Sequence, residues 1–249
     1  MGLFDFFRRG SGGPAEQERL LARHAENVMD KRSLSQERFQ SIEYLCKLGT
    51  EDAWRALLPR YNFTVDPSIT DREEKQYLFD AITRAGDSAV EPVKEFLRKT
   101  TAVNWPIKML QKLLSPEDFV AELLSVLANE DTAYQKNPER KIQAIVALEA
   151  VTDARVAPAV SKFLDDASED TRFHAVRTLL AQGDGQAADA LVALLARDDS
   201  MRVRTTIVDG LVTHAWKVAD AHREKVLALL GRLPNGPFTL TADATVKKA

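Results

Sequence analysis

Basic residues recur at equivalent places along the chain, namely Arg38, Lys75, Lys141, Arg172 and Arg204. A row of cations is the feature with which proteins track nucleic acid. The net charge of −3, however, argues against a polyanion-binding surface. An ion-pair ladder with acids of neighbouring segments explains the same cations, and we favour it over phosphate binding.

Acids also recur. An Asp stands twelve residues after Lys75, Lys141, Arg172 and the equivalent Pro106, and these acids are Asp87, Asp118, Asp153 and Asp184. Carboxylates can serve as general acids or bases. These four follow small or turn-forming residues such as Gly86 and Gly183, where an acid favours the start of a helix. We therefore interpret them as helix-capping acids that also supply the ladder partners.

Other chemistry-bearing residues are sparse. The histidines are His24, His174, His214 and His222, and none stands at a metal-binding helical spacing from another. The single Cys46 follows Leu45 on an apolar helix face and suits a small core residue. There is no phosphate-cradling glycine loop and no nucleophile elbow. The sequence predicts no catalytic, cofactor-binding or metal-binding residue, and hence no enzyme.

The elements that position these residues are amphipathic helices. Counting from each of the five cations and from Pro106, apolar residues recur at offsets four and seven, which lie on one helical face. The offset-seven positions are Leu45, Ile82, Leu113, Leu148, Leu179 and Leu211. The offset-four positions are Ile42, Phe79, Leu110, Ile145, Val176 and Val208. A second apolar helix follows each of these. The successive starts are 31 to 37 residues apart. A repeat period in this range is typical of stacked helical pairs.

Helix boundaries carry their own signals. Gly49, Gly86 and Gly183 suit helix C-caps. Ser115-Pro116 and Asn137-Pro138 place a capping side chain before a Pro at the first helical position, and Thr70 with Glu73 forms a capping box. We predict a tag and linker over residues 1–14, a capping helix over 15–33, six helix-turn-helix units over 34–232, and a tail over 233–249 that forms a small hairpin, an ordered cover or a disordered end.

The later units resemble the HEAT-like repeats of bacteria, the type also found in phycobilisome lyases. The pattern is an apolar pair, an acidic turn and Val-Arg or Thr-Arg followed by Ala or Leu. Its residues are Phe163-Leu164-Asp165-Asp166, Thr171-Arg172, Ala175, Leu179, Leu194-Leu195, Asp198-Asp199, Val203-Arg204 and Leu211. The match weakens toward the front, where Pro106 replaces the basic residue, and at Trp216, which replaces the Asp.

This resemblance implies an all-α, right-handed α-solenoid of about six repeats whose second helices line a concave groove. The groove candidates are then Arg55, Lys94, Arg98, Lys162 and Arg197. The function we favour is a non-catalytic scaffold or adaptor for protein partners whose identity the sequence does not state. The alternatives are a bilin-lyase-like enzyme component and a HEAT-like nucleic-acid-binding protein, although we expect no specific nucleic-acid binding.

Two loops are longer than a repeat junction needs, at 59–69 and 129–136, and both join a second helix to the next first helix. Long loops in compact domains are often functional. Tyr61, Phe63 and Tyr134 are therefore partner-binding candidates. For Tyr61 and Phe63 the favoured alternative is that they pack against the repeats, since aromatic residues usually bury.

The first nine residues combine four large apolar side chains, Leu3, Phe4, Phe6 and Phe7, with Arg8 and Arg9, ahead of a Gly-rich tether. This composition suits a docking peptide, a weak peripheral membrane anchor, or a segment that folds back on the solenoid. No stretch is long and apolar enough to span a membrane, and no secretory leader is evident, so we expect a cytoplasmic protein.

Overall fold

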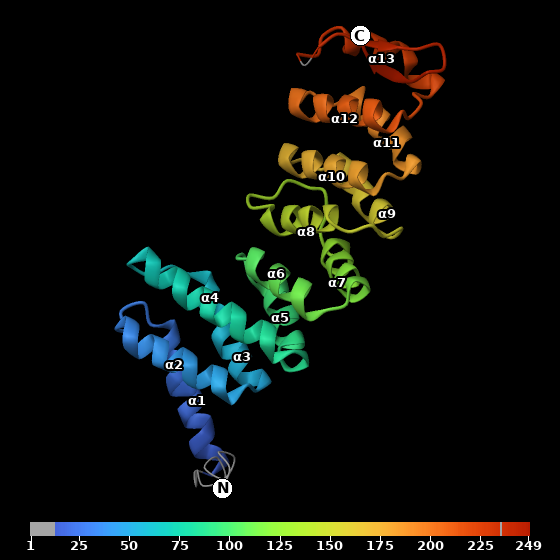
Figure 1. Cartoon of the computed structure of the whole chain (residues 1–249). Helices are drawn as coiled ribbons and strands as arrows, with labels where there is room; N and C mark the ends of the chain where they lie inside the picture. Colours follow the sequence, from blue (N-terminus) through green and yellow to red (C-terminus); the bar gives the residue numbers. More distant parts are fainter. Residues whose placement is uncertain (1–12, 235) are drawn as a thin grey trace. The chain divides into compact units, whose positions relative to one another are not determined.

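The computed structural model describes residues 13–234 and 236–249 and is built almost entirely from helices (Figure 1). The chain divides into two compact units, one ending at Leu114 and the other beginning at Ser115. Residues 1–12 of the predicted tag and linker, which spans residues 1–14, lie outside the described part of the chain. The predicted all-α helical-repeat fold is confirmed in the described residues of both units.

The first unit consists of first and second helices in alternation, preceded by one further helix. These are α1 (Pro14–Met29), α2 (Ser35–Leu48), α3 (Glu51–Leu57), α4 (Ser68–Ala85), α5 (Asp87–Lys99) and α6 (Asn104–Leu113), with a 3₁₀ turn η3 (Leu58–Asn62) after α3. Helix α1 packs on α2, and α2, α4 and α6 form a row of first helices. The capping-box prediction was wrong, because α4 begins at Ser68 and Thr70 lies inside it.

The second unit continues the alternation and ends in a hairpin. Its helices are α7 (Pro116–Ala128), α8 (Glu139–Glu149), α9 (Val156–Ser161), α10 (Glu169–Gln182), α11 (Ala188–Leu195), α12 (Met201–His214) and α13 (Arg223–Leu230). Three 3₁₀ turns, η4 (Lys162–Asp165), η5 (Gly185–Ala187) and η6 (Asp220–His222), extend or precede second helices. Within this unit α8, α10 and α12 lie side by side as a second row of first helices (Figure 1).

The repeat pattern explains the core. Leu148, Leu179 and Leu211, the predicted core leucines of α8, α10 and α12, are all fully buried. The neighbouring Gly210 allows α12 to approach α10 closely, because a Cβ added there would stand 2.3 Å from Leu180 Cδ2. Within the second unit, the helical period thus builds an apolar layer between the first helices and the second helices.

Several predicted boundary signals are present. Ser115 Oγ accepts a hydrogen bond from Asp118 N at 3.1 Å, which caps α7. Gly49 and Gly183 end α2 and α10 in the left-handed conformation, with φ of 63° and 67°. Pro138, by contrast, is the N-cap of α8 rather than its first helical residue.

The tail forms the hairpin that was one of three alternatives. Strands β1 (Phe238–Leu240) and β2 (Val246–Lys248) pair antiparallel, with Phe238 opposite Lys248. Phe238 and Val246 are buried while Thr239 and Lys247 are exposed, so the hairpin places one apolar face over α12 and α13.

Candidate functional site

The recurring cations of the first helices lie next to carboxylates, as the ladder interpretation requires. The nitrogen-to-oxygen distances are 2.9 Å for Arg38–Glu74, 2.8 Å for Lys75–Asp71, 2.6 Å for Lys141–Asp166, 2.7 Å for Arg172–Asp198 and 3.9 Å for Arg204–Asp199. Four of the five cations are therefore neutralised within the protein, which removes them from phosphate binding.

The predicted partners were nevertheless wrong. None of Asp87, Asp118, Asp153 and Asp184 pairs with a ladder cation; the partners lie elsewhere, in α4 and in the turns before α10 and α12. The four acids stay at the starts of second helices, where Asp184 accepts a hydrogen bond from Gln186 N at 2.9 Å. Hydrogen bonds from the Arg155 side chain and backbone lower the pKa of Asp153 to about 2.

We call each ion pair between a first-helix cation and a carboxylate a rung of the ladder. In the second unit, a rung links neighbouring segments through a single Asp. Asp166 accepts from Lys141 Nζ with Oδ2 and from Ser168 N with Oδ1, at 2.6 and 2.8 Å. The next rung repeats this, because Asp198 accepts from Arg172 and, at 2.8 Å, from Ser200 N. Each Asp therefore ties the cation of one first helix to the start of the next.

The first unit has a denser version of the same ladder. Glu74 is 1% exposed and accepts from both Arg38 and Arg60, while Asp71 accepts from Arg60 and Lys75. The fully buried Arg60 also donates to Phe63 O at 3.1 Å. Sequence reasoning missed Arg60, whose only signal was its position between Pro59 and Tyr61 in an aromatic loop.

The two aromatic candidates of that loop are core residues. Tyr61 is 4% exposed and donates its hydroxyl hydrogen to Lys75 O at 2.8 Å, and burial raises its pKa. Phe63 is 9% exposed and lies 4.6 Å from the Arg60 guanidinium. The structure therefore corrects their assignment as partner-binding residues in favour of the packing alternative.

Tyr134 shows the opposite behaviour, because 79% of it is exposed. Two hydrogen bonds fix the part of the loop just before Tyr134: Ala167 N donates to Thr132 O at 2.9 Å, and Lys162 Nζ donates to Glu130 O at 2.8 Å. A fixed loop thus presents an aromatic side chain to solvent. Met201, at the start of α12 on the same edge of the unit, is 43% exposed.

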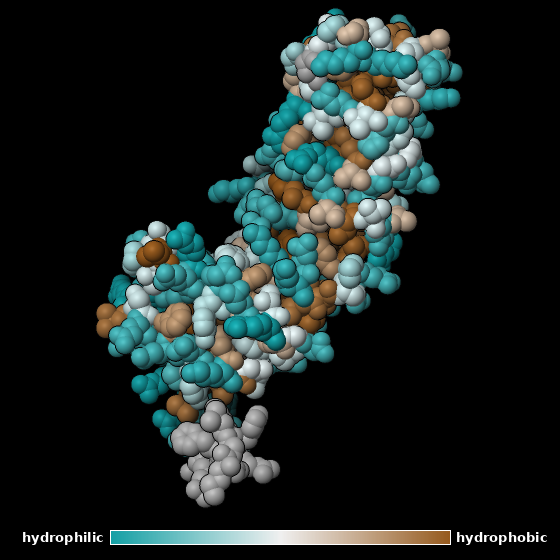
Figure 2. All heavy atoms as spheres, in the orientation of Figure 1, coloured by the Kyte–Doolittle hydropathy of each residue, from teal (hydrophilic) through white to brown (hydrophobic). Residues whose placement is uncertain are grey.

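The same edge of the first unit also carries exposed apolar side chains. Leu34, the N-cap of α2, is 68% exposed, and Ile69, in the first turn of α4, is 53% exposed. Figure 2 shows apolar surface at the start of α4. In both units, therefore, the edge where first helices begin carries large apolar residues that the fold leaves uncovered.

The cations predicted to line a groove are engaged in local interactions. Arg55 on α3 donates to Glu51 and Glu95, and these hydrogen bonds raise its pKa. Lys162 donates to Leu127 O at the end of α7, and Arg197 pairs with Asp165. Arg98 on α5 is 3.6 Å from Glu91, and Lys94 on the same helix is half-buried and also has an interaction partner.

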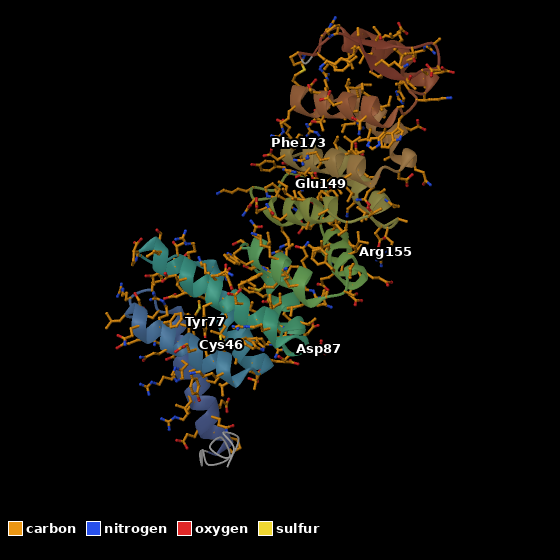
Figure 3. All side chains as sticks on the ribbon, viewed as in Figure 1. Cys46, Tyr77, Asp87, Glu149, Arg155 and Phe173 are labelled. Carbon is orange, nitrogen blue, oxygen red and sulfur yellow. The ribbon has the colours of Figure 1, made fainter. Side chains whose placement is uncertain are left out.

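The first-helix face of the second unit contains a cation–aromatic arrangement that sequence reasoning missed. The Arg202 guanidinium lies 3.8 Å from the centre of the Phe173 ring, and Arg177 lies 5.9 Å from it. Figure 3 shows Phe173 on α10 and Glu149 on α8, on the row of first helices. A hollow of about 540 Å³ borders Phe173, and another of about 510 Å³ borders Arg177.

The described residues offer little for catalysis. No group of three His, Cys, Asp or Glu side chains within residues 13–234 and 236–249 is placed to hold a metal ion. Cys46 is half-buried on the wall of a hollow beside Tyr77 (Figure 3), and burial raises the pKa of its thiol to about 12. The thiolate form is therefore scarce at neutral pH. His24 donates or accepts a 3.0 Å hydrogen bond with Ser41 and stacks on Tyr44.

No helix in the described part of the chain combines the length and apolar character that crossing a bilayer requires. Leu3, Phe4, Phe6 and Phe7 lie outside the described residues.

Comparison with known families gives one match. The family model for HEAT repeats matches residues 120–212, which run from within α7 to within α12. No curated protein matches this chain. The matched range contains both of the Asp-centred rungs, Lys141–Asp166 and Arg172–Asp198, and the buried leucines between them. The chain is therefore an all-α helical-repeat protein, and residues 120–212 are similar to HEAT repeats.

Proposed function

We propose that this chain is a non-catalytic scaffold that binds protein partners through the edge on which its first helices begin. HEAT repeats commonly serve protein–protein interaction, and an extended row of helices suits that role because it offers a long surface without a central active site. The observation that carries the proposal is Tyr134, which is 79% exposed on a loop fixed by backbone and lysine hydrogen bonds.

The energetic argument favours this edge over the second-helix groove. An exposed tyrosine on a pinned loop gains apolar contact area on binding and loses little conformational entropy. The groove cations Arg55 and Arg197, by contrast, already hold carboxylates, so a partner would have to displace those pairs. Met201 enlarges the apolar surface of the same edge in the second unit.

The test is capture of partners from an extract of the source cells with the full chain as bait. We expect Tyr134→Ala combined with Met201→Ala to lose the captured proteins and to leave the melting temperature unchanged. The matched control is Leu227→Ala, which removes a side chain that is 50% exposed on α13. Equal capture by the wild type and the double variant would exclude this edge as the interface.

The cellular location, the lyase-like alternative function and a role for residues 1–9 are further proposals from the sequence. We place the protein in the cytoplasm on the basis of its sequence. The lyase-like alternative rests on the sequence resemblance alone, and visible absorbance of the protein purified from its source would be the evidence for a bound bilin. The aromatic segment 1–9 is proposed as a second docking element on a partner or on an anionic membrane surface.

A further inference from the structure

Arg204 on α12 differs from the other ladder cations because its buried Nε has no acceptor among the described residues and its ion-pair partner there is a fully exposed Asp. Its side chain is only 20% exposed, its Nε is buried, and it donates no hydrogen bond to any described residue. Its nearest carboxylate, that of the fully exposed Asp199, is 3.9 Å away. A guanidinium carries five N–H donors, and buried donors without acceptors cost free energy.

The equivalent cations Lys141 and Arg172 show which acceptors Arg204 lacks. Lys141 donates to Asp131 O in the turn before its helix and to Asp166 in the turn after the next second helix. Arg172 likewise donates to Asp166 O before its helix and to Asp198 after the second helix that follows. A ladder cation of this unit is thus held from both sides, and the acceptor on the far side is an Asp carboxylate.

For Arg204, the turn after the second helix that follows it contains no such Asp. The turn after α13 is Gly231-Arg232-Leu233-Pro234-Asn235-Gly236-Pro237, which contains no acid. In the first unit, Lys75 pairs instead with Asp71, which lies one helical turn earlier in α4 at 2.8 Å. One turn before Arg204 stands Ser200, whose hydroxyl caps α12 and accepts from Val203 N.

We propose that Arg204 is an anion-binding residue that takes a carboxylate from outside the described chain. A carboxylate is the group that the equivalent cations hold, and its two oxygens match the planar fork of a guanidinium. The exposed fifth of the side chain gives access to a small planar group, while the buried remainder strengthens the interaction by excluding water.

The carboxylate that binds Arg204 has two candidate sources. An acidic side chain of a protein partner would add a rung to the ladder, and this source rests on the scaffold function proposed above. A small free carboxylate would occupy the position without any partner protein, and this source is independent of that function. The experiment therefore needs one probe for each.

The first probe is sodium acetate, titrated into the full-length protein at constant ionic strength with sodium chloride as the balancing salt. The readout is the Nε–Hε NMR resonance of Arg204, identified by its disappearance in Arg204→Gln. We expect a saturable shift with acetate that chloride does not reproduce. The resonances of Arg38 and Arg60 should not move, because their guanidinium groups already hold Glu74.

The second probe is a synthetic peptide with the sequence of residues 194–203, which carries the Asp198 and Ser200 of an existing rung, with Asp198→Asn as its control. A shift at concentrations at least tenfold lower than acetate, absent with the control peptide, would identify a protein-borne carboxylate. A shift with acetate alone would identify a free carboxylate. No specific shift with either probe would overturn the proposal, and would leave the Tyr134 capture result unaffected.

Discussion

Lys141 on α8 and Asp166 in the turn before α10 form an ion pair that is closed to solvent: Nζ and Oδ2 are 2.6 Å apart and neither side chain is exposed. Both ions lose their hydration on folding, so the pair is tolerated only because each partner has further hydrogen bonds. Lys141 also donates to Asp131 O, and Asp166 also accepts from Ser168 N. The pair thereby holds three segments of the HEAT-like region in register.

Asp166→Asn should destabilise the protein by about 3 kcal/mol, because the change leaves the Lys141 ammonium buried without a counter-ion. Asn retains the size of the side chain and the acceptor for Ser168 N, so the loss reports on charge. The measurement is urea unfolding at pH 7. The matched control is Asp165→Asn, where the neighbouring Asp is 62% exposed and the expected change is within about 0.5 kcal/mol. Adding Lys141→Met to Asp166→Asn should recover part of the loss, and a further loss would contradict the ion-pair account.

The first unit should lose stability in acid through Asp71. Desolvation raises the pKa of Asp71, but hydrogen bonds from Lys75 and Arg60 outweigh it, and the net pKa lies below the usual value. Because the folded-state pKa is the lower one, the stabilisation is complete above the unfolded value of about 3.9 and is lost as the pH falls through the folded value. The free energy of unfolding should therefore decrease below about pH 4.

Asp71→Asn provides the check on that assignment. The variant should be less stable than the wild type at pH 7, and its stability should fall less steeply below about pH 4. Asp66→Asn, an exposed change in the loop before α4, should keep the wild-type pH profile. Thermal unfolding across the pH range gives both quantities, and parallel profiles for Asp71→Asn and the wild type would exclude Asp71 as the titrating group.

The protein should not bind nucleic acid specifically. Four of the five ladder cations hold carboxylates, and the net charge is −3. We expect no complex with random duplex or single-stranded DNA tighter than about 1 μM at physiological salt in a gel-shift assay. Tight binding that weakens steeply as salt is added would show that other cations form a phosphate-binding surface.

Deleting residues 1–9 should leave the melting temperature nearly unchanged and weaken association with a partner or with anionic membranes. The segment carries four large apolar residues and two arginines, each arginine contributing about 1 kcal/mol near an anionic surface. Liposome sedimentation, partner capture and thermal melting are measured together. Replacing Arg8 and Arg9 with Gln separates the charge contribution from the apolar one. A large loss of stability with association intact would mean that the segment belongs to the folded protein.

The helical repeats and their apolar core follow from the order of the residues alone. Offsets of four and seven from each start depend only on the pitch of an α-helix. They predict Leu148, Leu179 and Leu211 in the core without reference to any tertiary contact, and each is fully buried. Capping by Ser115 and termination at Gly183 are equally local, because they depend on a few consecutive residues and their backbone angles.

Which charges form ion pairs, and which aromatic residues stay exposed, depends on how the repeats pack on one another. Asp153 and Asp166 are both acids near helix starts, but only the turn containing Asp166 lies against Lys141, a contact set by how one repeat packs on the next. Tyr61 and Tyr134 both stand in long loops, yet η3 and Arg60 draw Tyr61 into the core, while the hydrogen bonds around Thr132 leave Tyr134 in solvent. The division between Leu114 and Ser115 was likewise not evident, because the repeat period continues across it.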